Sequence, residues 1–172
     1  MTYANYLAWA KAYSGTTMPA VFVPAIVQKA VADFLKATEG WKAEPLKLLP
    51  VIEGGHYDAT DDSRVEVSCD LSTAFLPGKL SNERSAVCSV YLLTPRDVPY
   101  AAAVYTISLI QVLLQPALVL AGLSFTGIKF LSVSDVSESQ DVDDRGGRQF
   151  VKSLEITLRP LTQAESTPEE EP

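Results

Sequence analysis

The chain has 172 residues, of which 47% are hydrophobic and 20% charged, with a formal net charge of −7 and an isoelectric point of about 4.7. This composition is typical of a globular chain, and 172 residues suffice for one domain with a real core. The negative charge argues against a protein that grips nucleic acid by neutralising phosphates, although not against one that lets DNA pass.

Residues 1–23 are expected to form an N-terminal helical extension. Thr2 is suited to cap a helix that runs to about Tyr13, because aromatic and small residues recur at helical spacing along it. The segment lacks a basic start and an unbroken apolar run, so we do not interpret it as a secretory signal. A cytoplasmic product is the default expectation.

Residues 24–161 are expected to form one α+β domain. A helix is predicted from Pro24 to just before Gly40. Its apolar face is Ile26, Ala30, Phe34 and Ala37, and its polar face is Gln28, Lys29, Asp33 and Lys36. A short strand is predicted from Leu46 to Ile52, where Pro50 indicates a sheet edge or an early end.

The clearest strand pattern lies between Arg64 and Leu71, and its expected partner is Arg84 to Leu93. One face of the first strand is apolar (Val65, Val67, Cys69 and Leu71), and the other is expected to lie in water (Arg64, Glu66, Ser68 and Asp70). Cys69 and Cys88 fall on apolar faces without zinc-ligand spacing, so buried free thiols are expected.

The connection from Ser72 to Glu83 is too long for a tight hairpin and carries Phe75 and Leu76 beside Pro77-Gly78. Extended loops of this length in compact domains are often functional. Apolar residues at the tip suit docking onto a partner protein.

No charged residue occurs from Val98 to Ile128, a stretch that includes a predicted helix from Pro99 to Gln115. A surface helix of a monomer keeps a charged stripe, so this helix must be covered on most sides. A membrane is not the expected cover, because a spanning helix needs about 20 consecutive apolar residues. Here prolines and polar side chains interrupt the run, and no Lys/Arg cluster flanks it.

Both faces of this helix are apolar, which indicates a sheet on one side and another subunit on the other. The face expected on the sheet is Tyr100, Val104, Ile107, Ile110 and Leu114. The face expected at a subunit interface is Ala102, Tyr105, Leu109, Val112 and Leu113. A homo-oligomer is therefore expected.

The last strands are predicted at Leu123 to Val133, with a bulge at Gly127, and at Arg148 to Arg159. Ser134 to Gly147 is predicted as an acidic loop, and residues 162–172 as an acidic disordered tail. The expected fold is α+β, with a mixed or antiparallel sheet of about four to five strands and helices packed on one face.

No catalytic, cofactor or metal site is predicted. His56 is the only histidine, and no nucleophile motif accompanies it. Asp141, Asp143 and Gly146 partly match a calcium loop, but Arg145 occupies the third ligand position and Lys152 replaces the terminal glutamate.

The two arginines of this region have two open interpretations. Arg145 and Arg148 are expected either to pair with acidic groups of an adjacent subunit or to form local solvated pairs with neighbouring aspartates.

Six segments together resemble the tail terminator, or tail completion, proteins of long-tailed bacteriophages. They are AIVQKAVADFL, SRVEVSC, AVCSVYLLTP, YAAAVYTISLIQVLLQ, FTGIKFLSVSDV and RQFVKSLEITLRPL, with an acidic Arg-containing loop before the last. The resemblance covers about residues 24–161 and rests on element order and loop character. The N-terminal helix lies outside it.

The resemblance implies a structural virion protein at the neck–tail junction, assembled in the host cytoplasm and lacking catalytic residues. Members form a ring, usually hexameric, that terminates the tail tube and joins it to the neck. The implied partners are further copies of the chain, the tail tube protein and neck or connector proteins. DNA passes through the lumen without specific binding, and no membrane is involved.

Residues from the loops and the neutral helix are then expected at subunit or partner interfaces: Phe75, Leu76, Tyr105, Leu109, Val112, Arg145 and Arg148. The alternatives are a small-molecule-binding or regulatory α+β oligomer, another neck or head-completion protein, and an enzyme that uses His56 with nearby aspartates.

Overall fold

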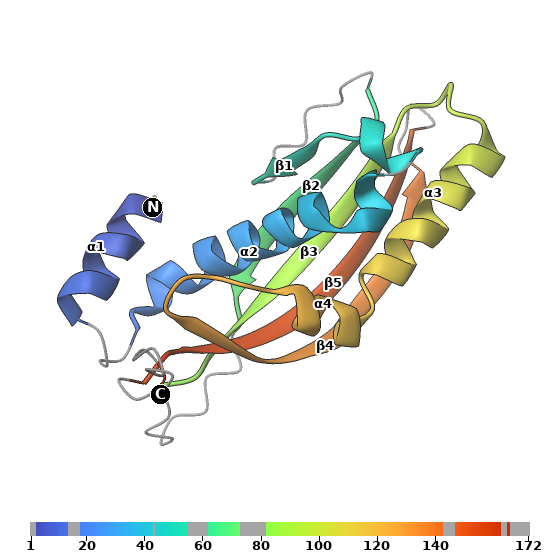
Figure 1. Ribbon diagram of the computed structural model, residues 1–172. Coiled ribbons are helices and arrows are strands. Elements are labelled where there is room, and N and C mark those ends of the chain that lie inside the picture. Colours follow the sequence, from blue (N-terminus) through green and yellow to red (C-terminus); the bar gives the residue numbers. More distant parts are fainter. Residues whose placement is uncertain are drawn as a thin grey trace, which may run out of the picture.

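The computed structural model describes residues 3–13, 18–42, 44–54, 62–72, 82–142, 147–162 and 165. Five strands form one mixed sheet in the order β1-β2-β3-β5-β4 (Figure 1). The short edge strand β1 runs parallel to β2, and every other neighbouring pair is antiparallel. The strands are β1 (Val51–Glu53), β2 (Arg64–Leu71), β3 (Arg84–Thr94), β4 (Ile128–Val142) and β5 (Arg148–Pro160).

Three helices lie over one face of this sheet, and a fourth stands near its end (Figure 1). They are α1 (Tyr3–Tyr13), α2 (Val23–Ala37), α3 (Tyr100–Leu113) and α4 (Pro116–Gly122). The α+β class and the placement of helices on one face are as predicted, whereas α4 is an additional helix that the sequence does not predict.

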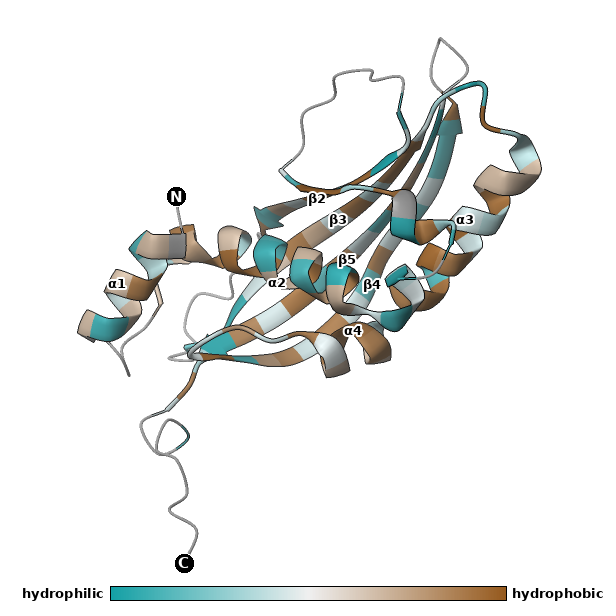
Figure 2. Ribbon diagram, turned by 45° about the horizontal axis from the view of Figure 1, so that its top comes forward, coloured by the Kyte–Doolittle hydropathy of each residue, from teal (hydrophilic) through white to brown (hydrophobic). Residues whose placement is uncertain are grey.

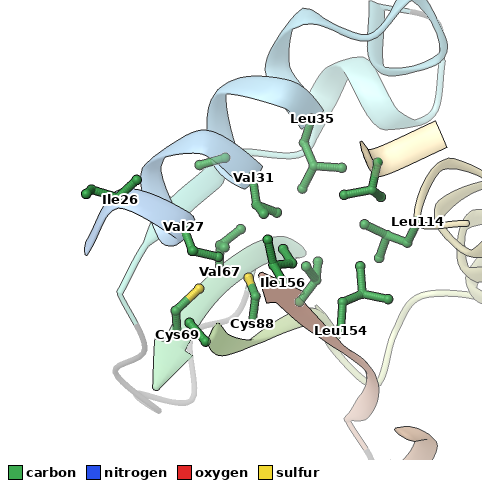
Figure 3. Packing of buried hydrophobic residues seen from close by; sticks show 14 of the residues in the cluster. Ile26, Val27, Val31, Leu35, Val67, Cys69, Cys88, Leu114, Leu154 and Ile156 are labelled. Carbon is green, nitrogen blue, oxygen red and sulfur yellow. The ribbon is translucent and has the colours of Figure 1, made fainter. Parts of the chain in front are cut away.

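Helix α2 begins with Pro24 in its first turn and is closed by Thr38, whose hydroxyl donates to the Phe34 carbonyl at 2.7 Å. Its buried stripe is centred on Val27, Val31 and Leu35. The stripe is shifted from the predicted one, because Phe34 is only half-buried and Ala37 is exposed. The apolar side chains of α2 point into the sheet, where they meet Val67 and Ile156 (Figure 3).

Cys69 and Cys88 face each other across β2 and β3 within this core (Figure 3). Both are buried free thiols, as predicted. Burial, together with the neighbouring Cys88, raises the pKa of the Cys69 thiol well above its ordinary value. The reactive thiolate form is therefore disfavoured.

The strand predicted from Leu46 to Ile52 is wrong over its first half. Leu46–Leu48 forms a single 3₁₀ turn, and the strand begins only at Val51, after Pro50. Leu46 is buried in the core, so the apolar character of this segment reflects burial rather than sheet pairing. Pro50 still contributes to the sheet edge, because its carbonyl accepts the Val65 N–H at 2.9 Å.

The boundary predicted for β4 is also wrong. The strand continues to Val142 through most of the segment predicted as an acidic loop. Register shifts between Phe130 and Ser132 and between Asp135 and Ser137 insert one extra residue each. Because each extra residue inverts the alternation, a regular period-two pattern does not extend through the strand. Gly127, predicted as a bulge, has φ +74° and lies in the turn before β4.

Helix α1 is fastened to the turn before β4 by Tyr6, which is only 2% exposed. The Tyr6 hydroxyl donates to the Thr126 carbonyl at 2.9 Å, and its ring meets Phe125 and Phe22 with centroids 5.1 and 5.9 Å apart. An aromatic cluster thus joins the N-terminal helix to the sheet.

Helix α4 packs against α2 at Gly122, where a Cβ atom would overlap the Phe34 ring. We expect Gly122→Ala to lower the free energy of unfolding by about 1–3 kcal/mol through overpacking. Chemical denaturation measures this loss, and the exposed Ala121→Ser serves as control. Adding Phe34→Leu should restore part of the lost stability, and a Gly122→Ala protein as stable as the parent would contradict this packing.

Candidate interaction surfaces

The outward side of α3 carries large apolar residues. Tyr100, Tyr105 and Val112 are 70%, 57% and 53% exposed, and Val104 of the same helix and Leu118 of α4 are exposed as well. We call these five residues the α3 surface. Figure 2 shows the contrast with α2, which has teal polar turns where α3 stays brown to pale. Leu109, a predicted interface residue, is half-buried and packs against the core.

The sheet-facing side of α3 differs from the predicted one. The buried residues are Ala103, Thr106, Ile107, Ile110 and, just past the helix, Leu114. Tyr100 and Val104, predicted to pack on the sheet, are exposed instead. The first turn of α3 lies beyond the edge of the sheet (Figure 1), and the side that turns toward the core is the one that carries Ala103 and Ile107.

A polar bridge fixes the middle of α3 to the two strands beneath it. Gln111 Nε2 donates to Glu138 Oε1 at 2.5 Å, and Lys152 Nζ lies 3.2 Å from Glu138 Oε2 and 2.7 Å from Asp135 Oδ1. Partial burial lowers the pKa of Lys152, but the hydrogen bonds to Asp135 and Glu138 outweigh it and leave the pKa raised. These contacts connect the middle of α3 to β4, and β4 to β5.

A groove of about 270 Å³ lies between the first half of α3 and the ends of β4 and β5. Its lining residues are Tyr100, Ala103, Val104, Ile107, Gln140, Asp141, Val142, Arg148 and Gln149. The Arg148 guanidinium stands over the Tyr100 ring, 5.2 Å from its centroid, and donates to the Val98 carbonyl at 3.1 Å. Arg148 thus connects the start of β5 to the segment that leads into α3. The lining of the groove carries one cation, Arg148, and one anion, Asp141.

The face of the sheet opposite the helices is rich in hydroxyl groups. Ser68, Ser89, Ser153 and Ser137 stand in one register row across four strands, and Ser89 and Ser153 share a hydrogen bond of 2.8 Å. The two bulges of β4 place all four of its serines on this face, namely Ser132, Ser134, Ser137 and Ser139.

One end of this face is not in water, contrary to prediction. The side chains of Arg64 and Glu66 are only 8% and 4% exposed, and Arg64 Nε lies 2.5 Å from Glu66 Oε1. Opposite charges at this separation compensate each other, which allows two groups that alone would stay solvated to be buried.

The structure places some predicted site residues and not others. Tyr105, Leu109 and Val112 lie along α3, and Arg148 lies at its start. Phe75, Leu76, Arg145 and His56 lie outside the described residues. Of the partial calcium loop, Asp141 belongs to β4 and Lys152 to β5, so these two positions form strands rather than a ligand loop.

The sequence predictions missed two features of these surfaces. Tyr100 and Val104 belong to the outward side of α3. The small residue Ala103, one turn before Ile107, could have indicated which side of the helix is buried. Glu165, in the predicted disordered tail, accepts hydrogen bonds from Arg159 and Thr162. The T-x-x-E spacing of Thr162 and Glu165 is the sequence pattern that indicates the contact between these two residues.

The described part of the chain contains no group of three or more His, Cys, Asp or Glu side chains placed to hold a metal ion. No single helix among the same residues is long and apolar enough to cross a membrane, although α3 and α4 pass that test as a pair bent by 62°. Ile110 and Val119 of that pair are fully buried within the subunit.

Comparison with known proteins identifies the fold. No family model and no curated protein matches the chain. Among solved structures, it is similar to a chain from the virion of a native gene transfer agent particle. The match has a TM-score of 0.59 and 13% sequence identity, and it covers 77% of this chain and 94% of that one. A second solved chain matches over 80% of this chain and 92% of its own, at 12% identity and a TM-score of 0.43. At such identity the first match establishes a shared α+β fold.

Proposed function

We propose that this chain is a structural virion component that forms a ring at the neck–tail junction of a phage-like particle. The ring would terminate the tail tube and join it to the neck while DNA passes through the lumen. The observation that carries the proposal is the α3 surface, which is exposed, largely apolar and without a charged residue. The shared fold with a chain of a gene transfer agent virion supports the same class of protein.

The apolar α3 surface favours burial against another copy. Exposed apolar patches on soluble proteins mark interaction sites. A ring requires a heterologous contact, in which the surface of one copy meets a different surface of the next and the rotation closes. The groove beside Tyr100 adds a recess whose lining combines apolar side chains with Arg148 and Asp141, suited to receive a side chain of the neighbour.

Charge pairing supports passage of DNA without specific binding. The register places Arg64, Lys129 and Arg159 on the hydroxyl-rich face of the sheet. Arg64 pairs with Glu66, and Lys129 and Arg159 share the carboxylate of Glu165. Affinity for nucleic acid comes chiefly from cations that neutralise phosphates. A serine-rich face whose cations are already paired would hold DNA weakly, whichever wall of the ring it forms.

The ring is tested by the size of the purified chain in solution. Light scattering is expected to give a mass several times the 18.6 kDa of one chain, and electron microscopy to show closed rings. A stable monomer or dimer at all concentrations, with no ring on added tail tube or neck components, would contradict the proposal. A dimer would instead favour a regulatory α+β domain.

A further inference from the structure

Five hydrogen bonds converge on one carboxylate, that of Glu165, near the start of β4 and the end of β5. Arg159 donates from Nη1 to Oε2 and from Nη2 to Oε1, both at 2.8 Å, and Lys129 donates to Oε1 at 2.9 Å. Thr162 donates its backbone N–H at 3.0 Å and its hydroxyl at 2.9 Å to Oε2. The donors come from β4, from β5 and from the segment after it.

A local turn explains only part of this arrangement. Thr162 and Glu165 have the reciprocal contacts of a capping box, since the Glu165 N–H also lies 3.4 Å from Thr162 Oγ1. A capping box requires neither Arg159 nor Lys129. These two residues are direct register partners on β5 and β4, so the sheet itself holds the two cations side by side.

Electrostatics favour an anion at this position. Like charges directly opposite each other on neighbouring strands repel, and a bound anion relieves that repulsion. The hydrogen bonds from Arg159, then from the Thr162 N–H and Lys129, hold the pKa of Glu165 well below its usual range. The planar fork of arginine matches phosphate as well as carboxylate geometry.

We propose that Lys129, Arg159 and Thr162 form an oxyanion clamp that the chain closes with its own Glu165. With the carboxylate in place the two cations are occupied, and free phosphate does not bind there. Once the charge of Glu165 is removed, the clamp takes a phosphate group. The clamp belongs to a single subunit and does not depend on the proposed ring.

The test follows thermal unfolding of the full chain as inorganic phosphate replaces chloride at constant ionic strength. A ligand that binds the folded state raises Tm as its concentration increases. We expect such a rise for Glu165→Gln and not for the parent, because the intramolecular carboxylate competes at high effective concentration and weakens phosphate binding by about tenfold or more. Adding Arg159→Gln to Glu165→Gln should abolish the rise.

The control Asp33→Asn makes the same change in net charge and also frees a lysine, because Asp33 pairs with Lys29 at 2.9 Å on the exposed side of α2. It should respond to phosphate like the parent. The proposal is overturned if Glu165→Gln shows no phosphate-dependent rise, if the parent responds as strongly, or if Asp33→Asn gains the same response.

Discussion

Val112→Glu is expected to dissociate the proposed ring into single chains while leaving each chain folded. Val112 is 53% exposed on α3, so a carboxylate there is solvated in the free subunit. At a subunit interface the same carboxylate would be buried without a partner, which costs about 3–5 kcal/mol. This corresponds to a loss of roughly two to four powers of ten in affinity at each contact.

Light scattering of the variant and its parent measures this effect, and thermal unfolding verifies that the variant is folded. Val21→Glu is the matched control, because Val21 is 60% exposed just before the start of α2, at the end of that helix far from α3 (Figure 1). A Val112→Glu protein that keeps the mass of the parent ring would remove Val112 from the interface.

Glu66→Leu is expected to destabilise the folded subunit strongly. It leaves the Arg64 guanidinium buried beside an apolar side chain, and breaking a buried ion pair in this way costs about 3–5 kcal/mol. Chemical denaturation measures the loss as a lower free energy of unfolding.

The double variant Arg64→Met with Glu66→Leu is expected to recover most of that loss, because removing both charges also removes the desolvation cost. If Glu66→Leu cost less than about 1 kcal/mol, the pair would behave as a surface salt bridge. The burial assigned to this end of the sheet would then be wrong.

Regular periodicity makes most of the fold predictable. Strands β2 and β3 alternate without interruption, and α2 has a proline at its start and an amphipathic pattern, so local physics and the tertiary fold agree. The predicted β4 is too short because two bulges break the alternation, and an acidic sequence rich in serine also suits a loop. The burial of Arg64 and Glu66 is not predictable in this way, because alternation reveals the face of a side chain and not its exposure.

The candidate surface is predictable in kind rather than in detail. The absence of charge between Val98 and Ile128 indicates that two sides of α3 are buried in the assembled protein. In the single chain, α3 does present a large exposed apolar surface. Which residues face the sheet depends on where the helix meets the strands, and that is a tertiary property. For this reason the predicted side of Tyr100 and Val104 is wrong.

Thiol labelling tests most directly whether the α3 surface is covered by a second copy. The native Cys69 and Cys88 are buried, so maleimide is expected to react chiefly with an introduced, exposed cysteine. We expect maleimide to react much more slowly with Val112→Cys in the assembled fraction than in diluted single chains, while Val21→Cys reacts equally fast in both. Equal rates for Val112→Cys in an assembled ring would contradict a role for α3 in joining the subunits.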